Sequence, residues 1–171
     1  MDLQPTLAGE LVVLRPTVAA DWDDLFAVAA DPLIWEVHPA HDRWQEPVFR
    51  RYFEDALASG GGLTILDKAS GKVIGASRYA FPDAARAEIE IGWTFIARDY
   101  WGGIYNREIK RLMLDHIHQF FDGAVFVVGE RNVRSRRAME KIGGILQEGR
   151  IERGDGTLLP DHVFYVIRAG K

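Results

Sequence analysis

The sequence predicts one domain, residues 1–171, of mixed α/β class, in which a mostly antiparallel sheet of about seven strands is flanked by about four helices. Three strand-like segments at residues 63–67, 73–81 and 86–96 follow one another across turn-forming residues, which is typical of an antiparallel meander. The continuous apolar run at residues 124–128 follows a long amphipathic segment, which indicates a buried central strand parallel to its predecessor. No internal repeat or low-complexity linker divides the chain.

The first half of the chain is predicted to form one short strand and two helices before the meander begins. Residues 11–15 form a short apolar run that ends at a proline, and residues 21–30 show helical spacing of apolar side chains. Residues 31–45 contain prolines, histidines and tryptophans without a period, which predicts an irregular loop. A second helix is predicted over residues 47–58, with a proline in its first turn, and three glycines at residues 60–62 end it.

The second half of the chain is predicted to form two helices, separated by the buried strand, and a terminal hairpin. The apolar positions of residues 105–121 follow a period of 3.6 residues, which makes this segment the most distinct helix of the chain. A helix over residues 132–142 has a capping residue at its start and two glycines after its end. Residues 145–151 and 162–168 are predicted to pair as a hairpin around the turn at residues 154–156.

The composition argues against several classes of function. A formal net charge of −4 disfavours an electrostatic attraction to nucleic acid or to anionic membranes. The chain has no cysteine, which excludes a cysteine nucleophile and a thiolate metal site. No basic segment followed by an apolar run opens the sequence, and no stretch approaches the roughly 20 apolar residues that span a bilayer. We therefore expect a cytoplasmic protein that binds neither nucleic acid nor membrane.

The third strand of the meander places two carboxylates on one face. Because strand side chains repeat every two residues, Glu88 and Glu90 share a face, whereas Ile89, Ile91 and Trp93 occupy the other. The two carboxylates are either solvent-facing groups of a half-exposed strand or a functional pair.

A glycine pair joins the meander to the long helix. Gly102 and Gly103 follow Trp101 just ahead of the helical period. Free backbone N–H groups and the positive end of the dipole make a helix N-terminus an anion site, and glycines let a phosphate approach the main chain. The same two glycines can also form a simple tight turn, so the residues alone leave both interpretations open. Asn132, ahead of the second helix, is predicted to cap it.

Two segments in this order resemble the GNAT superfamily of N-acetyltransferases, and in particular its branch of ribosomal-protein N-terminal acetyltransferases. The segments are Trp101-Gly102-Gly103-Ile104-Tyr105-Asn106-Arg107-Glu108 and, after a strand, Asn132-Val133-Arg134-Ser135-Arg136-Arg137-Ala138-Met139-Glu140-Lys141-Ile142-Gly143. The order of the predicted elements is also similar to the GNAT fold, so the resemblance covers nearly the whole chain. It implies an enzyme that uses acetyl-CoA, in a fold whose parallel pair of central strands is splayed at the cofactor site.

The resemblance implies a cofactor site made mainly of backbone groups. In the family, the amides of a Gln/Arg-x-x-Gly-x-Gly/Ala turn bind the pyrophosphate of coenzyme A, and the preceding strand polarises the thioester. Here Asp99 stands at the Gln/Arg position and Ile104 at the final Gly/Ala position, and a carboxylate repels a pyrophosphate unless it turns away. The arginines of the second motif either contact the phosphates or form a solvated helix face. The predicted cofactor-binding residues are Trp93, Thr94, Phe95, Ile96, Trp101, Gly102, Gly103, Ile104, Tyr105, Asn106, Asn132, Arg134, Ser135 and Arg136.

Acetyl transfer from a thioester to an amine requires a neutral amine, a polarised carbonyl and a stabilised sulfur leaving group. By the resemblance, Glu90 lies at the acidic position of the family, and Glu88 shares its face, so these two are the candidate bases, acting directly or through a water molecule. Many members carry a tyrosine as the acid where this chain has Met139, which cannot donate a proton. Ser135 is the substitute candidate, and its alternative interpretation is an ordinary serine in the first turn of a helix.

The irregular loop at residues 31–45 matches the region in which the family builds its acceptor pocket, so Trp35, His38 and Arg43 are predicted to bind the acceptor. The expected acceptor is a small-molecule amine or a protein N-terminus. His38 and His41 lack a third patterned ligand, and we therefore expect no metal. Members of the family often dimerise, so a homodimer is among the assemblies that we expect.

Two other functions stay open on the sequence. One is a domain that binds acyl-CoA as a sensed ligand without turnover, because Met139 and Asp99 depart from the family pattern. The other is an unrelated nucleotide-binding domain that uses the glycine pair for a different phosphate, although the chain has no Gly-Lys-Ser/Thr sequence and no G-x-G-x-x-G sequence. Calorimetry with acetyl-CoA, ATP and NAD separates these possibilities.

Overall fold

An eight-stranded sheet is the framework of the computed structural model, which describes residues 1–170. Its strands lie in the order β1-β2-β3-β4-β5-β6-β8-β7. The strands are β1 (Leu7–Ala8), β2 (Val12–Pro16), β3 (Gly62–Asp67), β4 (Val73–Asp83), β5 (Glu88–Ile96), β6 (Gly123–Gly129), β7 (Ile145–Leu146) and β8 (His162–Arg168). The helices of the described residues are α1 (Trp22–Ala29), α2 (Glu46–Ser59), α3 (Ile104–Ile117) and α4 (Val133–Lys141), with short 3₁₀ helices at Ala19–Asp21, Pro32–Ile34 and Arg98–Tyr100.

The chain divides into two compact units, which we describe separately. The N-terminal unit comprises Met1–Arg78 and Trp93–Leu112, and the C-terminal unit comprises Tyr79–Gly92 and residues 113–170. Strands β4 and β5 and helix α3 contribute residues to both units. The prediction of a single domain remains a prediction.

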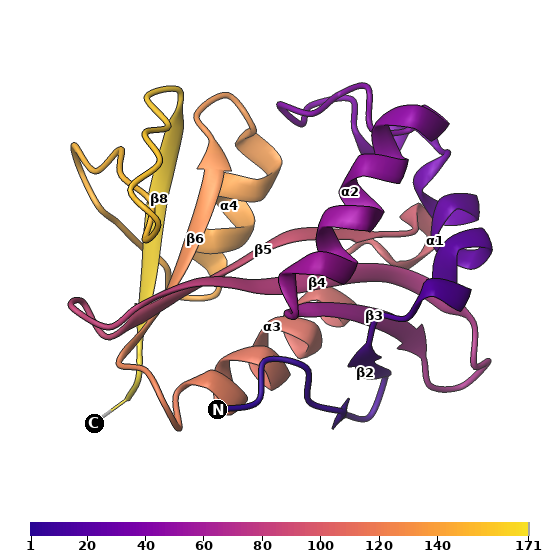
Figure 1. Cartoon of the computed structure of the whole chain (residues 1–171), viewed down its shortest axis with the longest axis horizontal. Coiled ribbons are helices and arrows are strands. Elements are labelled where there is room, and N and C mark those ends of the chain that lie inside the picture. The colour runs from indigo at the N-terminus through magenta and orange to yellow at the C-terminus, as the bar shows by residue number, and fades with distance from the viewer. Residues whose placement is uncertain (171) are drawn as a thin grey trace. The chain divides into compact units, whose positions relative to one another are not determined.

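The N-terminal unit is an antiparallel array with helices on both faces. Strand β2 pairs with β1 and β3, and β3 pairs with β4, all antiparallel. Helices α1 and α2 lie on one side of β3 and β4, and the start of α3 lies on the other (Figure 1). The α1–α2 side is packed with aromatic rings, among which Trp22, Phe49 and Phe95 belong to one apolar cluster. Such ring packing buries a large apolar area and stabilises this side of the sheet.

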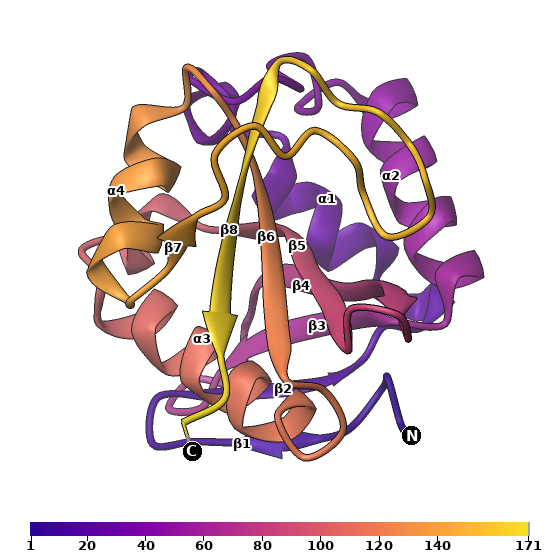
Figure 2. The same ribbon diagram turned by 90° about the vertical axis from the view of Figure 1, so that its left-hand side faces the viewer.

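The C-terminal unit contains the parallel pair that the sequence predicts. Strand β6 pairs in parallel with β5 over Glu88–Glu90 and Gly123–Val125, and this register ends at Glu90. On its other edge β6 pairs antiparallel with β8 along its whole length, and β7 pairs with β8. Figure 2 shows β6, β8 and β7 side by side. The β6 run is buried at every position except Val127, as the unbroken apolar sequence indicates.

The predicted order of strands and helices is confirmed, with differences near the C-terminus. The strand expected over residues 145–151 is wrong beyond Leu146. The chain leaves the sheet after one further backbone hydrogen bond, from Gln147 N to Phe164 O, and residues 151–159 form a tight turn with a one-residue bridge between Glu152 and Leu158. The helix expected over residues 105–121 ends at Ile117, where the backbone hydrogen bonds tighten to an i to i−3 pattern. Strand β1 and the 3₁₀ helices were not predicted, since segments of two or three residues carry no period.

The helices of the described part are short. The longest, α2 and α3, have 14 residues each. Across residues 1–170, no helix combines the length and apolar character that a bilayer crossing requires.

The Glu108 carboxylate anchors the segment ahead of β2. It accepts hydrogen bonds from the backbone N–H groups of Glu10, Leu11 and Val12, at 2.8, 2.7 and 2.9 Å. The close approach needs a glycine, because a Cβ placed on Gly9 would come within 2.5 Å of the carboxyl carbon of Glu108. Burial alone raises the pKa of the Glu108 carboxyl, but the three N–H donors outweigh it and hold the pKa below its usual value.

Replacing Glu108 with alanine should therefore lower the free energy of unfolding by about 2–3 kcal/mol near neutral pH, since three backbone donors lose a charged acceptor. Because the folded-state pKa is lowered, the contribution is present above the unfolded pKa of about 4.3 and is lost as the pH falls through the folded value. Urea unfolding at pH 7 and at pH 3 measures both effects, with Glu108→Gln as the matched uncharged variant. An equal penalty for Glu108→Ala at the two pH values would contradict this account.

Candidate cofactor and acceptor sites

The turn between β5 and α3 is open to solvent. Residues 101–104 are exposed, and Gly102 and Gly103 adopt left-handed φ angles of 117° and 105°. A Cβ on either glycine would meet no atom within 4 Å, so the requirement for glycine is conformational and the space beside the main chain is open. The indole N–H of Trp101 donates to the Ile96 carbonyl at 3.1 Å and ties the turn to the end of β5.

The backbone N–H groups of this turn are not consumed by the fold. The first backbone hydrogen bond of α3 runs from Arg107 N to Gly103 O, at 2.9 Å. Within residues 1–170, no carbonyl or side chain accepts from the preceding amides of residues 102–106. Five unused donors therefore lie at the positive end of a 14-residue helix, which is typical of an anion site.

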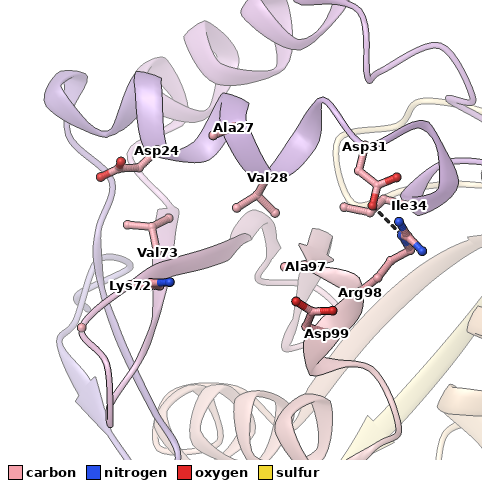
Figure 3. A pocket seen from close by; sticks show the side chains of 11 residues that line it. Asp24, Ala27, Val28, Asp31, Ile34, Lys72, Val73, Ala97, Arg98 and Asp99 are labelled. Atoms are coloured by element: carbon pink, nitrogen blue, oxygen red, sulfur yellow. Dashed lines mark hydrogen bonds and ion pairs between the residues drawn. The ribbon is translucent and has the colours of Figure 1, made fainter.

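Asp99, which departs from the family motif, lies at a neighbouring cavity. This cavity, of about 610 Å³, is lined by α1, by the turn between β3 and β4, and by the 3₁₀ helix that holds Asp99. The Asp99 carboxylate points into it, and Arg98 forms an ion pair there with Asp31 (Figure 3). The carboxylate is thus turned toward the cavity that α1 lines.

Trp93 interrupts the extended conformation of β5. Its φ of 53° lies in the left-handed region, which is rare for a bulky residue and costs about 1–3 kcal/mol. The hydroxyl of Tyr52 on α2 donates to the Trp93 carbonyl at 2.6 Å and helps to hold this conformation. Residues kept in such conformations cluster at functional sites. Trp93 is the first residue of the strand segment 93–96, to which the resemblance assigns the thioester.

Three polar side chains meet behind that segment. The Lys110 ammonium on α3 donates to the Thr94 hydroxyl at 2.8 Å, and the hydroxyl groups of Thr94 and Ser77 lie 2.8 Å apart. Lys110 is only 4% exposed, and burial lowers its pKa to about 7. Thr94 is therefore engaged through its side chain, while Phe95 and Ile96 are buried in the core.

The two carboxylates of β5 share a face, as the alternation predicts, but the interpretation as solvent-facing groups is wrong. Glu88 is 2% exposed and forms ion pairs with Arg150 and Arg168 at 2.9 and 2.6 Å. Two arginines thus neutralise a buried carboxylate, which indicates a structural role for Glu88.

Glu90 differs from Glu88 because it has one arginine rather than two. Arg153 contacts both of its carboxylate oxygens, at 3.1 and 2.8 Å. Burial raises the pKa of Glu90 to about 7, and the attraction to Arg153 only partly opposes this effect. A carboxylate with a pKa near neutrality is suited to general base catalysis. Arg150 and Arg153 lie between β7 and β8, and their contacts to β5 explain why the predicted strand stops at Leu146.

Asn132 caps α4, as predicted. Its side-chain oxygen accepts from Ser135 N at 3.2 Å. The Ser135 hydroxyl has no hydrogen-bond partner within residues 1–170 and is half-buried. Arg136 is already engaged, since it donates to the Tyr165 hydroxyl and to the Glu130 carbonyl at 3.1 and 3.0 Å, and Arg134 is exposed.

Met139 is buried at 5% exposure. The residue that replaces the family's tyrosine therefore has a place in the apolar core of the C-terminal unit, and it offers no proton to a substrate.

The predicted acceptor residues gather around Trp35 in the N-terminal unit. Trp35 is 1% exposed, its indole N–H donates to the Ala29 carbonyl at 2.8 Å, and its ring packs on Phe95. His38 lies edge-on to the Trp35 ring, and its Nδ1 accepts from Ala40 N at 2.9 Å. The Arg43 guanidinium lies 5.1 Å from the centroid of the same ring. Trp35 is thus the buried aromatic residue on which His38 and Arg43 pack, and Arg43 is the charged residue among the three.

Several site residues were not found from the sequence. Tyr52 and Arg78 gave no signal, because one belongs to the apolar period of a helix and the other to an ordinary strand position. Lys110 stands in the sequence between the apolar positions of its helix, where a polar residue is expected to be solvated, yet it is buried. Arg153 lay in a segment expected to be a strand, and nothing local indicated that it pairs with Glu90.

Comparison with known proteins identifies the family of the chain. A family model described as acetyltransferase (GNAT) domain matches residues 12–145, most of the chain. The chain therefore belongs to the GNAT acetyltransferase domain family, and it is an N-acetyltransferase. No curated protein gives a significant match.

Solved structures share the fold along almost the whole chain. A GCN5-related N-acetyltransferase from Brucella melitensis has a TM-score of 0.76 and 22% identity, with 96% of this chain and 79% of that chain covered. The microcin C7 self-immunity acetyltransferase MccE, in complex with acetyl-CoA and AMP, has a TM-score of 0.74 and 14% identity, over 98% and 99% of the two chains. Spermidine N-acetyltransferase from Vibrio cholerae, in complex with CoA and spermine, has a TM-score of 0.64 and 15% identity, over 94% and 96%.

Proposed function

We propose that this protein transfers an acetyl group from acetyl-CoA to a primary amine, on a small molecule or at a protein N-terminus, by direct attack in a ternary complex. The observation that carries the proposal is the set of unused backbone N–H groups of residues 102–106 at the start of α3. A pyrophosphate is an anion that this set fits, because several unused donors lie beside open space and two glycines. Two structurally similar acetyltransferases are known in complex with acetyl-CoA or CoA.

Each residue of the site has one role in the proposed acetyl transfer. When bound, acetyl-CoA supplies a thioester, so that the amine nitrogen bonds to the acetyl carbon while the carbon–sulfur bond breaks. Glu90 takes a proton from the amine, directly or through a water molecule, because its pKa near 7 leaves about half of the carboxyl ionised at neutral pH. The Ser135 hydroxyl, which has no hydrogen-bond partner among residues 1–170, donates a hydrogen bond to the departing thiolate sulfur and stabilises its negative charge. Asn132 and Arg134 contact the cofactor at the start of α4.

Membership of an acetyltransferase family argues against the alternative function, a sensor that binds acyl-CoA without turnover. The buried Met139 favours it, since the common proton donor of the family is missing. Release of thiol in the presence of an amine separates the candidates, because a sensor binds the cofactor and releases none. Absence of release across a broad panel of amines, amino sugars and peptides, including peptides with ribosomal-protein N-termini, would contradict the transferase. Use of such peptides would also place the chain in the ribosomal-protein branch.

The main-chain site can be tested by removing one N–H group. Ile104 is the first residue of α3 and is 59% exposed, and proline is well tolerated at the first position of a helix. Ile104→Pro should therefore keep the fold but weaken acetyl-CoA binding by about 10- to 100-fold, the value of one hydrogen bond to a charged group. Calorimetry measures the affinity, and Ile104→Ala, which keeps the N–H, is the matched control. Equal affinities of the two variants would show that this amide is not a phosphate donor.

A further inference from the structure

Two arginines flank one tyrosine in the N-terminal unit. The Arg43 guanidinium lies 5.0 Å from the centroid of the Tyr52 ring and 5.1 Å from that of Trp35. The Arg78 guanidinium lies 5.4 Å from the Tyr52 centroid and 4.6 Å from that of Trp93, and it donates to the Tyr52 carbonyl at 3.2 Å. The irregular loop, α2, β4 and β5 thus each bring a residue to one cationic aromatic cluster.

Arg43 lacks the carboxylate partner that three other ring-stacked arginines of the described residues have. Arg50 lies over Trp22 and pairs with Glu46 at 2.8 Å. Arg153 lies over Phe81 and pairs with Glu90, and Arg150 lies over Phe164 and pairs with Glu88. For Arg43, in contrast, no ion pair forms within residues 1–170, and its sequence neighbour Asp42 is exposed and makes none with it.

Arg43 therefore carries a positive charge that has no ion-pair partner among residues 1–170, in a partly dehydrated place. Burial lowers the pKa of Arg43, and the nearby Arg78 lowers it further by repulsion, although a guanidinium remains charged throughout the physiological range. Half-buried cations of this kind gain most from an anion that replaces their lost hydration. Guanidinium groups bind carboxylates and phosphates with paired hydrogen bonds, which makes these two groups the matching ligands.

We propose that Arg43, supported by Arg78, binds an anionic group of the acceptor, a carboxylate or a phosphate, so that the preferred substrate is an amine bearing an acid group. This inference rests on the proposed function. The Arg78 guanidinium lies over the ring of Trp93, which is the first residue of the strand segment assigned to the thioester. The acid group is therefore bound close to that segment. The acceptor is accordingly compact, with few bonds between amine and acid, and differs from a polyamine such as the spermine bound to the Vibrio cholerae enzyme.

Matched pairs of acceptors test the proposal. Glycine is compared with glycinamide, and O-phosphoethanolamine with ethanolamine, by thiol release from acetyl-CoA. We expect at least a tenfold higher kcat/KM for the acid member of one pair, and the pair that shows it identifies carboxylate or phosphate as the group. Amine reactivity alone favours glycinamide, because its ammonium group is more acidic than that of glycine and more of it is in the neutral, reactive form. A preference for glycine would therefore have to come from binding of its carboxylate. Equal or better use of the neutral members would overturn the proposal.

Variants separate an anion site from a structural anchor. Arg43→Met keeps much of the stacking on Trp35 and Tyr52 but removes the charge, and should abolish the preference for the acid member while leaving acetyl-CoA affinity unchanged. Arg43→Lys should restore part of the preference. The matched control is Arg50→Met, which removes a ring-stacked arginine that has a carboxylate partner and should leave the preference unchanged. A uniform loss with both members of a pair in Arg43→Met would show that Arg43 only anchors the loop.

Direct binding distinguishes failure of this inference from failure of the proposed function. N-acetylglycine, N-acetylglycinamide and inorganic phosphate are titrated into the wild type and Arg43→Met by calorimetry, without cofactor. An anion site binds N-acetylglycine or phosphate at least tenfold more tightly than N-acetylglycinamide, and Arg43→Met loses the difference. Lack of acetyl-CoA binding contradicts the proposed function alone, whereas absence of any preference for the anions contradicts this inference alone.

Discussion

Replacing Glu90 with glutamine should lower the rate of acetyl transfer by about 10²- to 10⁴-fold, the usual contribution of a general base, without changing the affinity for acetyl-CoA. Glutamine has nearly the same shape and keeps an oxygen toward Arg153, and the carboxyl of Glu90 is already about half neutral near pH 7, so this variant should lose less stability than Glu88→Gln and stay folded. Single-turnover measurements at saturating acetyl-CoA report the chemical step, and calorimetry reports the affinity. A rate within a few-fold of the wild type would show that Glu90 is not the base.

The pH dependence gives a second signature of Glu90. A base works in its ionised form, so kcat/KM should rise with pH through an apparent pKa of about 7. Arg153 stabilises the ionised carboxyl, and Arg153→Gln should therefore move this limb of the profile to higher pH. A merely structural role of Arg153 would lower the rate at every pH without moving the limb.

Glu88→Gln is the matched control for both experiments. Glu88 lies on the same face of β5 and is equally buried, but Arg150 and Arg168 both bind it. Breaking a buried ion pair on one side leaves two arginines without their partner, so this variant should be destabilised by about 3–5 kcal/mol. Its remaining folded fraction should keep the rate and the pH profile of the wild type. A shift of the profile in Glu88→Gln would show that the profile does not report Glu90 alone.

The fold could be predicted from the sequence wherever a period spans enough residues. The alternation of β5, the unbroken apolar run of β6 and the 3.6-residue period of α3 each predict one element, although Glu88, Glu90 and Lys110 are buried on faces that these patterns leave polar. The departure at residue 147 could not be predicted in this way. There the apolar pattern favours a strand, but Arg150 and Arg153 reach buried carboxylates of β5, and these contacts join residues about 60 positions apart.

The candidate site was predictable only in part, for a related reason. The free amides of residues 102–106 follow from a local rule, because every helix start leaves N–H groups without intrahelical partners. The left-handed conformation of Trp93 does not follow from local propensity, since a tryptophan rarely adopts it; the hydrogen bond from Tyr52, on another element, helps to hold it. The pKa of Glu90 likewise depends on burial and on Arg153, neither of which the alternation of one strand reveals.

Lys110 is the clearest case in which a helical pattern gives the wrong exposure for a side chain. Its burial leads to a prediction about how the stability of the protein depends on pH. Its position between the apolar residues of α3 suggests a solvated side chain, yet it is 4% exposed. Burial lowers its pKa from 10.5 to about 7, so the folded protein releases this proton at a lower pH than the unfolded chain does. Between these values the unfolded state holds one more proton, and stability must therefore rise with pH by up to about 1.4 kcal/mol per pH unit.

Lys110→Met removes the ammonium and keeps a side chain of similar length, while Thr94 and Ser77 retain their contact with each other. The variant should be more stable than the wild type by several kcal/mol below pH 7, where the wild type carries a buried charge. Its advantage should shrink steadily from pH 7 to pH 9, because the wild type becomes neutral while the variant has nothing to titrate. Urea unfolding of both proteins at pH 6, 7, 8 and 9 measures the difference. A constant difference over this range would mean that Lys110 stays charged in the fold, which would require an anionic partner strong enough to offset its burial.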